Sequence, residues 1–182
     1  MATAGPNSPS AASGWTNSSN VYSSNDTYAT YSIAADSNSA VLKAQGYGFA
    51  IPSGATINGV TVVAEVKASA AGLIRMIHLY LLDTSGNATG TDKTDYSYWT
   101  TSDVNHSCGS SSDLWGCALT DTWINNSNFG VSFQAYNGDG AVSRTAYVDY
   151  ISITVDYTVA SGQPMQARSR LVPFVHKSQV GW

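Results

Sequence analysis

The stretch Ile51–Lys67, IPSGATINGVTVVAEVK, constrains the fold more than any other part of the chain. It opens with Pro52-Ser53-Gly54, which is typical of a turn because proline fixes φ and glycine accepts the positive φ that other residues resist. From Val60 onward, apolar residues occupy every second position, and the positions between them become polar toward the end. This is the pattern of an antiparallel strand with one buried face, and no helical period fits it.

Similar patterns predict strands elsewhere in the chain. They cover residues 27–33, 40–49, 73–82, 129–135 and 147–159, with a short aromatic strand at Tyr96, Tyr98 and Trp99. One short helical turn is predicted after Thr120 or Asp121, either of which can cap it. Short strands joined by turns, without long helices, predict an all-β fold: an antiparallel β-sandwich of jelly-roll type with extended N- and C-terminal arms.

The length sets the domain organisation. A chain of 182 residues with 43% hydrophobic content can fill one core and is short for two. We therefore expect one sandwich domain over residues 15–159. Residues 1–14, rich in Ala, Ser, Pro and Gly, are expected to form a flexible or extended arm that orders only on a partner. Residues 160–182 are expected to form a C-terminal docking arm.

Charge is scarce and unevenly distributed. Charged residues make up 11% of the chain, against a usual share of about 25%. Residues 1–157 hold five Lys or Arg and all twelve acids, giving −7, whereas the remaining residues carry three cations and no acid, giving +3. An acidic body argues against a nucleic-acid partner. No apolar run approaches the roughly 20 residues of a spanning helix, and the N-terminus lacks signal-peptide features, so no membrane partner is expected.

Aromatic residues among turn formers suggest a sugar-binding platform. The candidate glycan-facing residues are Trp15, Tyr22, Tyr96, Tyr98 and Trp99. For the rings near the N-terminus the alternative is that they cover the edge of the core, because aromatic rings suit half-buried strand surfaces.

The residues predict no catalytic site, cofactor or metal. His78, in the middle of a predicted strand, has no nucleophile or carboxylate placed beside it by a motif. Glycoside hydrolysis needs two carboxylates in a cleft, and Glu65 is the only glutamate. The Asp residues of the loop 83–95 do not have EF-hand spacing. We therefore expect a protein that is not an enzyme.

The two cysteines stand at the ends of Cys108-GSSSDLWG-Cys117. A disulfide closing a loop of about ten residues would contribute roughly 2.7 kcal/mol. Two free buried thiols are one alternative, and a zinc site is another, although only His106 lies nearby as a further ligand. A disulfide without a signal peptide fits a protein made in a bacterial cytoplasm and released by lysis.

Five blocks, in order, carry a resemblance to a known family. They are the motif GWTN-x-x-N-x-Y-x-x-x-D-x-Y-A-T over 14–30, GFAIPSGATINGVTV over 48–62, SSDLWG over 111–116, INNSNFGVSF over 124–133 and VDYISITVDYT over 148–158. The chain from Gly14 to Thr158 thereby resembles a family of tailed-bacteriophage virion proteins. The resemblance implies a jelly-roll domain on the virion surface and carries over no catalytic residue. The cysteine pair and the tail after Thr158 depart from the pattern.

The tail combines cations with apolar side chains beyond a Ser-Gly linker. Its expected docking residues are Arg168, Arg170, Leu171, Phe174, Val175, Lys177 and Trp182. The alternative is that the tail folds back over its own sandwich.

These observations predict a non-enzymatic bacteriophage virion structural protein, a capsid decoration (cement) or head-surface protein that binds neighbouring virion subunits. We expect it at the virion surface as a homo-oligomer, for which a trimer is one candidate. The alternative is a tail appendage adhesin or carbohydrate-binding module that recognises host surface glycans.

Overall fold

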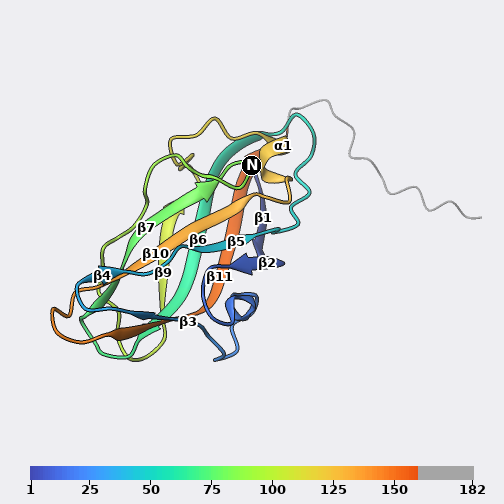
Figure 1. The fold of residues 1–182 in the computed structure, drawn as a ribbon. Helices are drawn as coiled ribbons and strands as arrows, with labels where there is room; N and C mark the ends of the chain where they lie inside the picture. The colour runs from blue at the N-terminus through green and yellow to red at the C-terminus, as the bar shows by residue number, and fades with distance from the viewer. Residues whose placement is uncertain (160–182) are drawn as a thin grey trace, which may run out of the picture.

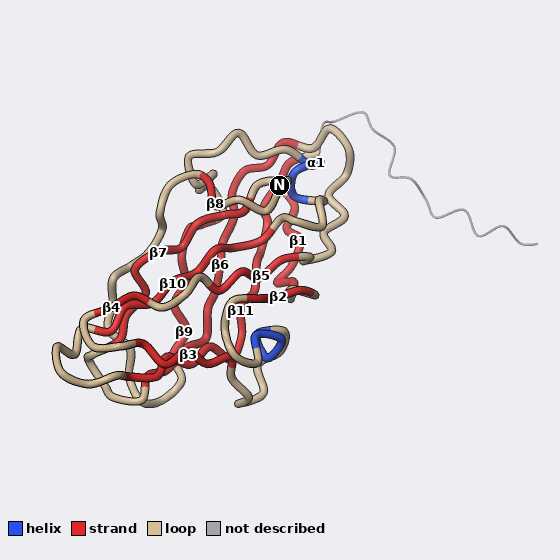
Figure 2. The backbone as a smooth tube through the Cα atoms, viewed as in Figure 1, coloured by secondary structure: helices blue, strands red, loops and turns tan. Residues whose placement is uncertain are grey.

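The chain forms two antiparallel sheets packed face to face, in a computed structural model that describes residues 1–159 (Figures 1 and 2). The five-stranded sheet has the order β1 (Ala2–Asn7), β11 (Arg144–Thr158), β6 (Thr56–Ala68) and β9 (Val104–Ser110), and β3 (Ala29–Ile33) also pairs with β11. The six-stranded sheet has the order β2 (Ala11–Ser13), β5 (Leu42–Gln45), β10 (Gly130–Asn137), β7 (Ile74–Leu82) and β8 (Ala88–Thr89), and β4 (Ser37–Asn38) pairs with β10. The prediction of an antiparallel β-sandwich of jelly-roll type is confirmed.

The helices are one turn each. They are the 3-10 helix η1 (Ser18–Val21) and α1 (Asp121–Ile124). The α1 turn has the predicted cap, because the Thr120 side chain accepts a hydrogen bond from the Trp123 amide at 3.2 Å. Among the described residues, no helix is long and apolar enough to cross a membrane.

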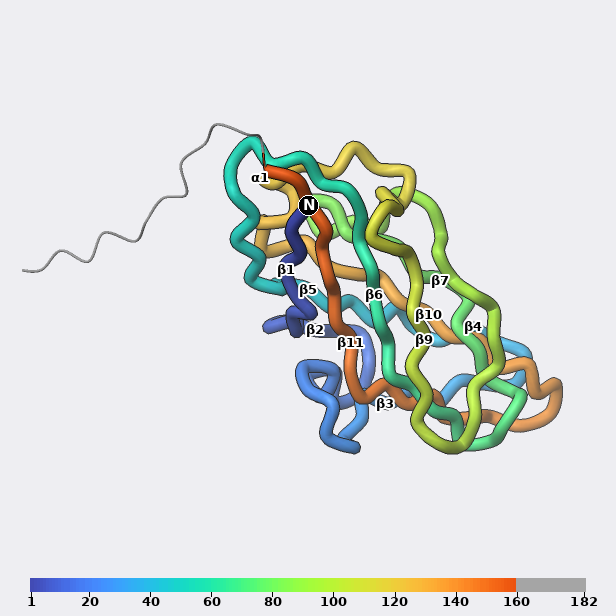
Figure 3. Tube along the Cα trace, turned by 180° about the vertical axis from the view of Figure 1, so that it is seen from behind, coloured from blue at the N-terminus to red at the C-terminus, as the bar shows by residue number. Residues whose placement is uncertain are grey.

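The core lies between β6 and β11 on one side and β7 and β10 on the other. In β6 the predicted alternation holds, since Val60, Val62, Ala64 and Val66 are all fully buried. Figure 3 shows β11, β6 and β9 side by side, so β6 is an inner strand of its sheet. From the opposite sheet, Phe133 packs in the core with its ring centroid 6.0 Å from that of Trp99. Each fully buried side chain of this size contributes roughly 1.5–3 kcal/mol.

Strand β11 contains a bulge that the sequence pattern did not reveal. Simple alternation places Tyr147 and Asp149 on the same face as Ile151, but Val148 is the residue that joins Ile151 in the hydrophobic core, and Tyr147 is only half-buried. The register against β6 shifts between Val148 and Tyr150, so Asp149 is the extra residue. Its buried carboxylate accepts hydrogen bonds from the Asn25 and Asp26 amides at 2.9 and 3.1 Å, which joins that loop to the sheet.

The N-terminal segment is part of the sandwich. Residues 1–14 are extended, but the prediction that they order only on a partner is corrected, because β1 pairs with β11 and β2 pairs with β5. Side chains reinforce the pairing: the Thr3 hydroxyl donates to the Asp156 carboxylate at 2.6 Å, and the Asn7 amide donates to the Tyr47 carbonyl at 2.9 Å. Residues 1–14 thereby supply one edge strand to each sheet.

The structure contains a strand that was not predicted, and it lacks the predicted aromatic strand. Strand β9 was not predicted, because its sequence VNHSCGS is mostly polar; it is an edge strand that pairs with β6 alone. The aromatic residues Tyr96, Tyr98 and Trp99 do not form a strand, and only Tyr98 makes a bridge, to Arg75.

Both cysteines are free thiols, so the predicted disulfide is corrected. Cys108 lies on β9 and its side chain is buried in the core. Cys117 lies in the loop after β9, beside Gly90, and its thiol donates to the Trp115 carbonyl at 3.5 Å. The two side chains are therefore packed in different surroundings.

Thiol labelling of the native protein is expected to be slow. Burial raises the pKa of Cys108 to about 11 and also raises the pKa of Cys117, so little reactive thiolate exists at pH 8. We expect the half-buried Cys117 to react first, and both thiols to react in urea without added reductant, as counted by mass spectrometry. A native mass lower by two hydrogens, with no labelling in urea, would show that the disulfide forms.

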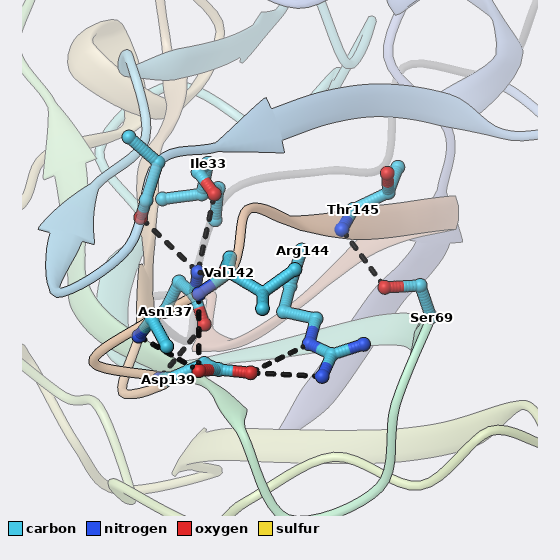
Figure 4. A network of polar contacts seen from close by, with 9 residues as sticks. Ile33, Ser69, Asn137, Asp139, Val142, Arg144 and Thr145 are labelled. Carbon is cyan, nitrogen blue, oxygen red and sulfur yellow. Dashed lines mark hydrogen bonds and ion pairs between the residues drawn. The ribbon is translucent and has the colours of Figure 1, made fainter.

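Asn137 ties the end of β10 to the end of β3 and to the loop that follows β10 (Figure 4). Its buried side-chain amide donates to the carbonyls of Ile33, Ala34 and Val142 at 3.1, 3.1 and 2.9 Å. Its side-chain oxygen accepts from the amide of Asp139, whose carboxylate pairs with Arg144 at 2.8 Å. This network fixes the hairpin that follows β10, and with it the neighbouring residue Tyr136.

Candidate functional site

The outer face of the six-stranded sheet brings an arginine and a tyrosine together on adjacent strands. In β7, Arg75 stands between the buried residues Ile74 and Met76 and therefore points away from the core. In β10, Tyr136 precedes the buried Asn137 in the same way. Arg75 and Tyr136 are direct partners in the β7–β10 ladder, so their side chains are cross-strand neighbours.

The segment after β8 follows the other edge of β7. The Lys93 amide donates to the Leu79 carbonyl at 3.0 Å, and the Trp99 amide donates to the Ile74 carbonyl at 2.8 Å. Tyr98 consequently forms its bridge to Arg75 from the side opposite Tyr136.

We call Arg75, Tyr96, Tyr98 and Tyr136 the arginine–tyrosine cluster. The guanidinium carbon of Arg75 lies 5.9, 5.3 and 5.4 Å from the ring centroids of Tyr96, Tyr98 and Tyr136, within the range of cation–π contacts. Tyr96 is 54% exposed and Tyr98 is 49% exposed. The cluster therefore presents two large rings to solvent, held beside a cation.

Tyr136 is fixed from its hydroxyl end. The hydroxyl donates a hydrogen bond to the Asp36 carboxylate, and this bond, together with burial, raises the pKa of Tyr136. The phenol therefore stays protonated at neutral pH. The Asp36 amide donates to the Asp139 carbonyl at 2.9 Å, which connects this contact to the Asn137 network.

A histidine–aspartate pair lies beside the cluster on β7. His78 Nδ1 is 2.6 Å from the Asp92 carboxylate, and its ring stacks on Tyr80 with centroids 5.7 Å apart. The other Asp92 oxygen accepts from the Leu79 and Thr94 amides at 2.9 and 3.1 Å. Sequence reasoning missed Asp92 as the partner of His78, because the contact depends on how the loop follows the β7 edge.

A second pair holds the other end of the same loop. Asp95 contacts His106 Nδ1 at 2.7 Å and accepts from the Ser97 amide at 3.0 Å. The segment 92–98, which carries Tyr96 and Tyr98, is therefore attached to β7 through Asp92 and to β9 through Asp95.

Acid is expected to weaken this loop. Burial alone would raise the pKa of Asp92, but the Leu79 amide and His78 outweigh it and lower the pKa; for Asp95, His106 and the Ser97 amide outweigh burial in the same way. A carboxyl whose pKa is lowered by folding adds stability above its unfolded value of about 3.9, and this stability is lost as the pH falls through the folded value.

Melting temperatures recorded from pH 7 downward should therefore fall below about pH 4. The double variant Asp92→Asn with Asp95→Asn should have a lower melting temperature than the wild-type protein at pH 7, and its melting temperature should fall less as the pH is lowered. An equally steep fall in both proteins would show that these two carboxyls do not contribute.

Two of the predicted glycan-facing residues are buried, and their prediction is corrected. Trp15 is 6% exposed, and its indole nitrogen donates to the Ala40 carbonyl at 2.8 Å. Trp99 is 1% exposed and packs on Phe133. Both indoles belong to the core, which was the alternative interpretation for the N-terminal rings.

Of the other candidates, the structure brings together only Tyr96 and Tyr98. Tyr22 is half-buried and bridges Tyr150 on the five-stranded sheet. The predicted docking arm, residues 160–182, lies outside the described residues. Sequence reasoning missed Arg75 and Tyr136. The Asn-Gly turn after Tyr136 was an available signal, but simple alternation places Arg75 on the face of the buried Leu79 and Leu81, and Arg75 points outward only because the β7–β10 register shifts between Met76 and His78.

A second cation–π contact lies on the five-stranded sheet, and its cation, unlike Arg75, has a carboxylate partner. Lys67 Nζ lies 3.6 Å from the Tyr28 ring centroid and 5.9 Å from that of Tyr147. Asp103 lies 3.7 Å from the same nitrogen, so the Lys67 charge has an acidic partner. Lys67 is therefore a matched control for Arg75 in binding experiments.

Within residues 1–159, no group of three or more His, Cys, Asp or Glu side chains is arranged to hold a metal ion.

Comparisons with known proteins concern the fold alone. No protein-family model and no curated protein sequence matches the chain. Two similar solved structures are one described as "CBM4 structure and function" and the N-terminal cellulose-binding domain of β-1,4-glucanase C from Cellulomonas fimi. The first has a TM-score of 0.45 and 12% identity, and the match covers 74% of this chain and 87% of that chain. The second has a TM-score of 0.37 and 14% identity, and the match covers 69% of this chain and 76% of that chain.

Proposed function

We propose that this protein is a non-catalytic glycan-binding protein whose binding surface is the arginine–tyrosine cluster. The observation that carries the proposal is the exposure of Tyr96 and Tyr98, at 54% and 49%, on a segment fixed to β7 and β9. Tyrosine rings offer rigid apolar area for the C–H faces of a sugar, and their hydroxyl groups can hydrogen-bond its edges. Little conformational entropy is lost on binding, because the segment is already held in place.

Polar side chains extend this surface across the sheet. Tyr80 on β7 and Lys43 on β5 lie on either side of the buried Ser132 of β10, and Gln134 lies opposite His78. The Gln134 amide nitrogen donates to the Ser39 carbonyl at 2.6 Å, which orients the side chain. A sheet face with aromatic groups at one end and hydrogen-bonding groups beside them suits an extended sugar chain.

A glycan array tests this function. We expect saturable binding of the full chain to at least one polysaccharide, and a loss of affinity of about tenfold or more in the double variant Tyr96→Ala with Tyr98→Ala, since each aromatic contact contributes about 0.5–1.5 kcal/mol beyond area burial. The control Tyr28→Ala removes a ring on the other sheet and should leave binding unchanged. If the wild-type protein binds nothing, or if the double variant binds equally well, the proposal fails.

The ordered sequence blocks favour a second proposal, compatible with the first: a virion structural protein of a tailed bacteriophage. On that proposal the sandwich is displayed on the particle as a decoration protein or as part of a tail appendage. Immunogold labelling of intact and tail-stripped particles, with antibody against residues 15–158, tests it. Label over the heads would support decoration, and label only at the tail end would support an adhesin. Unlabelled particles would contradict both.

A further inference from the structure

We propose that the ligand of the arginine–tyrosine cluster is an acidic polysaccharide, and that Arg75 binds its carboxylate. This inference rests on the proposed glycan-binding function and adds the chemical class of the sugar. It follows from the charge balance around Arg75.

Among the Lys and Arg side chains of residues 1–159, Arg75 is the one that makes neither an ion pair nor a hydrogen bond. Lys67, Lys93 and Arg144 lie 3.7, 2.9 and 2.8 Å from the carboxylates of Asp103, Asp113 and Asp139. Lys43 donates to the Gly86 carbonyl at 2.7 Å. None of the ion pairs in this part of the chain includes Arg75, although all twelve acids of the protein lie there.

The surroundings of Arg75 make its unpaired charge costly. Its Nε is buried and has no hydrogen-bond partner among the described residues. The three tyrosine rings remove water from the guanidinium and return only part of the lost hydration as cation–π attraction. A ligand carboxylate that accepts two parallel N–H bonds from the guanidinium would restore part of that energy, because the planar guanidinium offers paired donors that match the two carboxylate oxygens.

The acids near the cluster restrict which anions can bind. Asp36 accepts from the Tyr136 hydroxyl, Asp92 contacts His78, and Asp95 contacts His106, so each is held by a partner and does not reach Arg75 within ion-pair distance. Their negative field still opposes densely charged ligands such as polyphosphate. A sugar chain with one carboxylate per residue, spaced by neutral hydroxyl groups, fits this balance better.

Pairs of polysaccharides that differ only in the charge of their carboxyl groups test whether the carboxylate contributes to binding. Polygalacturonate, alginate and hyaluronate are each compared with their methyl-esterified forms, in which the carboxyl is neutral, by calorimetric titration of the full chain. We expect at least one acidic form to bind about tenfold or more tightly than its ester, since hydrogen bonds to charged groups contribute about 1.5–3 kcal/mol. Added salt should reduce this preference.

Three variants assign the preference to Arg75. Arg75→Gln should abolish the preference for the acid over its ester, Arg75→Lys should keep only part of it because the bidentate geometry is lost, and the control Lys67→Gln should keep it in full. Melting curves establish that each variant is folded. If Arg75→Gln does not fold, competition on the wild-type protein replaces it, and free galacturonate should compete better than galactose.

The outcomes separate this inference from the function on which it rests. Equal binding of acids and esters, binding of neutral glycans alone, or a preference that survives Arg75→Gln would overturn the acidic ligand while leaving glycan binding intact. Equal competition by galacturonate and galactose would overturn it as well. Absence of binding to every glycan on the array would remove the proposed function, and this inference with it.

Discussion

Replacing Trp115 by alanine is expected to lower the free energy of unfolding by about 3–5 kcal/mol. The indole is fully buried, and its nitrogen donates to the Val60 carbonyl at 2.9 Å. Trp115 thereby packs the loop after β9 onto β6. The variant loses the buried ring, leaves a cavity and leaves the Val60 carbonyl without this donor.

Two variants make the Trp115 result interpretable. Trp115→Phe keeps a large ring but loses the hydrogen bond, so it should be less destabilised than Trp115→Ala. Trp123→Ala removes a tryptophan that is only partly buried and donates to the Leu82 carbonyl at 2.9 Å, so it should also cost less. Urea unfolding measures all three. An effect of Trp115→Ala no larger than that of Trp123→Ala would contradict the packing described here.

Replacing Asn137 by alanine is expected to lower the free energy of unfolding by about 2–4 kcal/mol, because three backbone carbonyls at a buried position lose one shared donor. Water cannot easily replace the amide, since Asn137 has no exposed surface. Asn137→Asp should be at least as unfavourable, because a carboxylate oxygen would then face these carbonyls.

The matched control is Asn128→Ala. The Asn128 side chain also donates to a backbone carbonyl, that of Thr84 at 2.9 Å, but it is exposed and water can take its place. Thermal and urea unfolding should show a small change for Asn128→Ala and a large one for Asn137→Ala. Similar changes in the two variants would mean that the network in Figure 4 contributes little.

The Asn137 network also bears on the candidate site. Tyr136 lies one residue before Asn137, and the Asp36 carboxylate that holds its hydroxyl comes from a loop whose backbone bonds to Asp139. The stability of this end of the sandwich and the position of the Tyr136 ring are therefore coupled. If the proposed glycan binding holds, replacing Asn137 should weaken it as well.

The strands that could be predicted are those with clear alternation of period two. β6 and the second half of β11 carry branched apolar residues at every second position, which indicates both the strand and its buried face. β9 could not be predicted, because an edge strand with one contacting face needs few apolar residues. The bulge at Asp149 has no signature in composition, and it depends on a buried carboxylate binding two distant amides.

The candidate site was predictable only in part. Tyr96 and Tyr98 could be selected as sugar-facing because they are aromatic residues in a polar loop. The buried state of Trp15 and Trp99 could not be inferred in the same way, since it is set by packing against Phe133 on another strand. Arg75 could not be selected from the sequence. Its neighbours in the cluster are set by the register of β7 with β10 and by the bridge to Tyr98, and a single sequence specifies neither.

The proposed binding surface can be mapped by NMR, from the amide shifts that the strongest-binding glycan of the array causes in the isotope-labelled chain. Binding through the arginine–tyrosine cluster predicts the largest shifts at residues 75–80, 96–98 and 134–136, with little change around Lys67. The largest shifts on the five-stranded sheet, around Lys67 and Tyr28, would contradict the assignment of the binding surface.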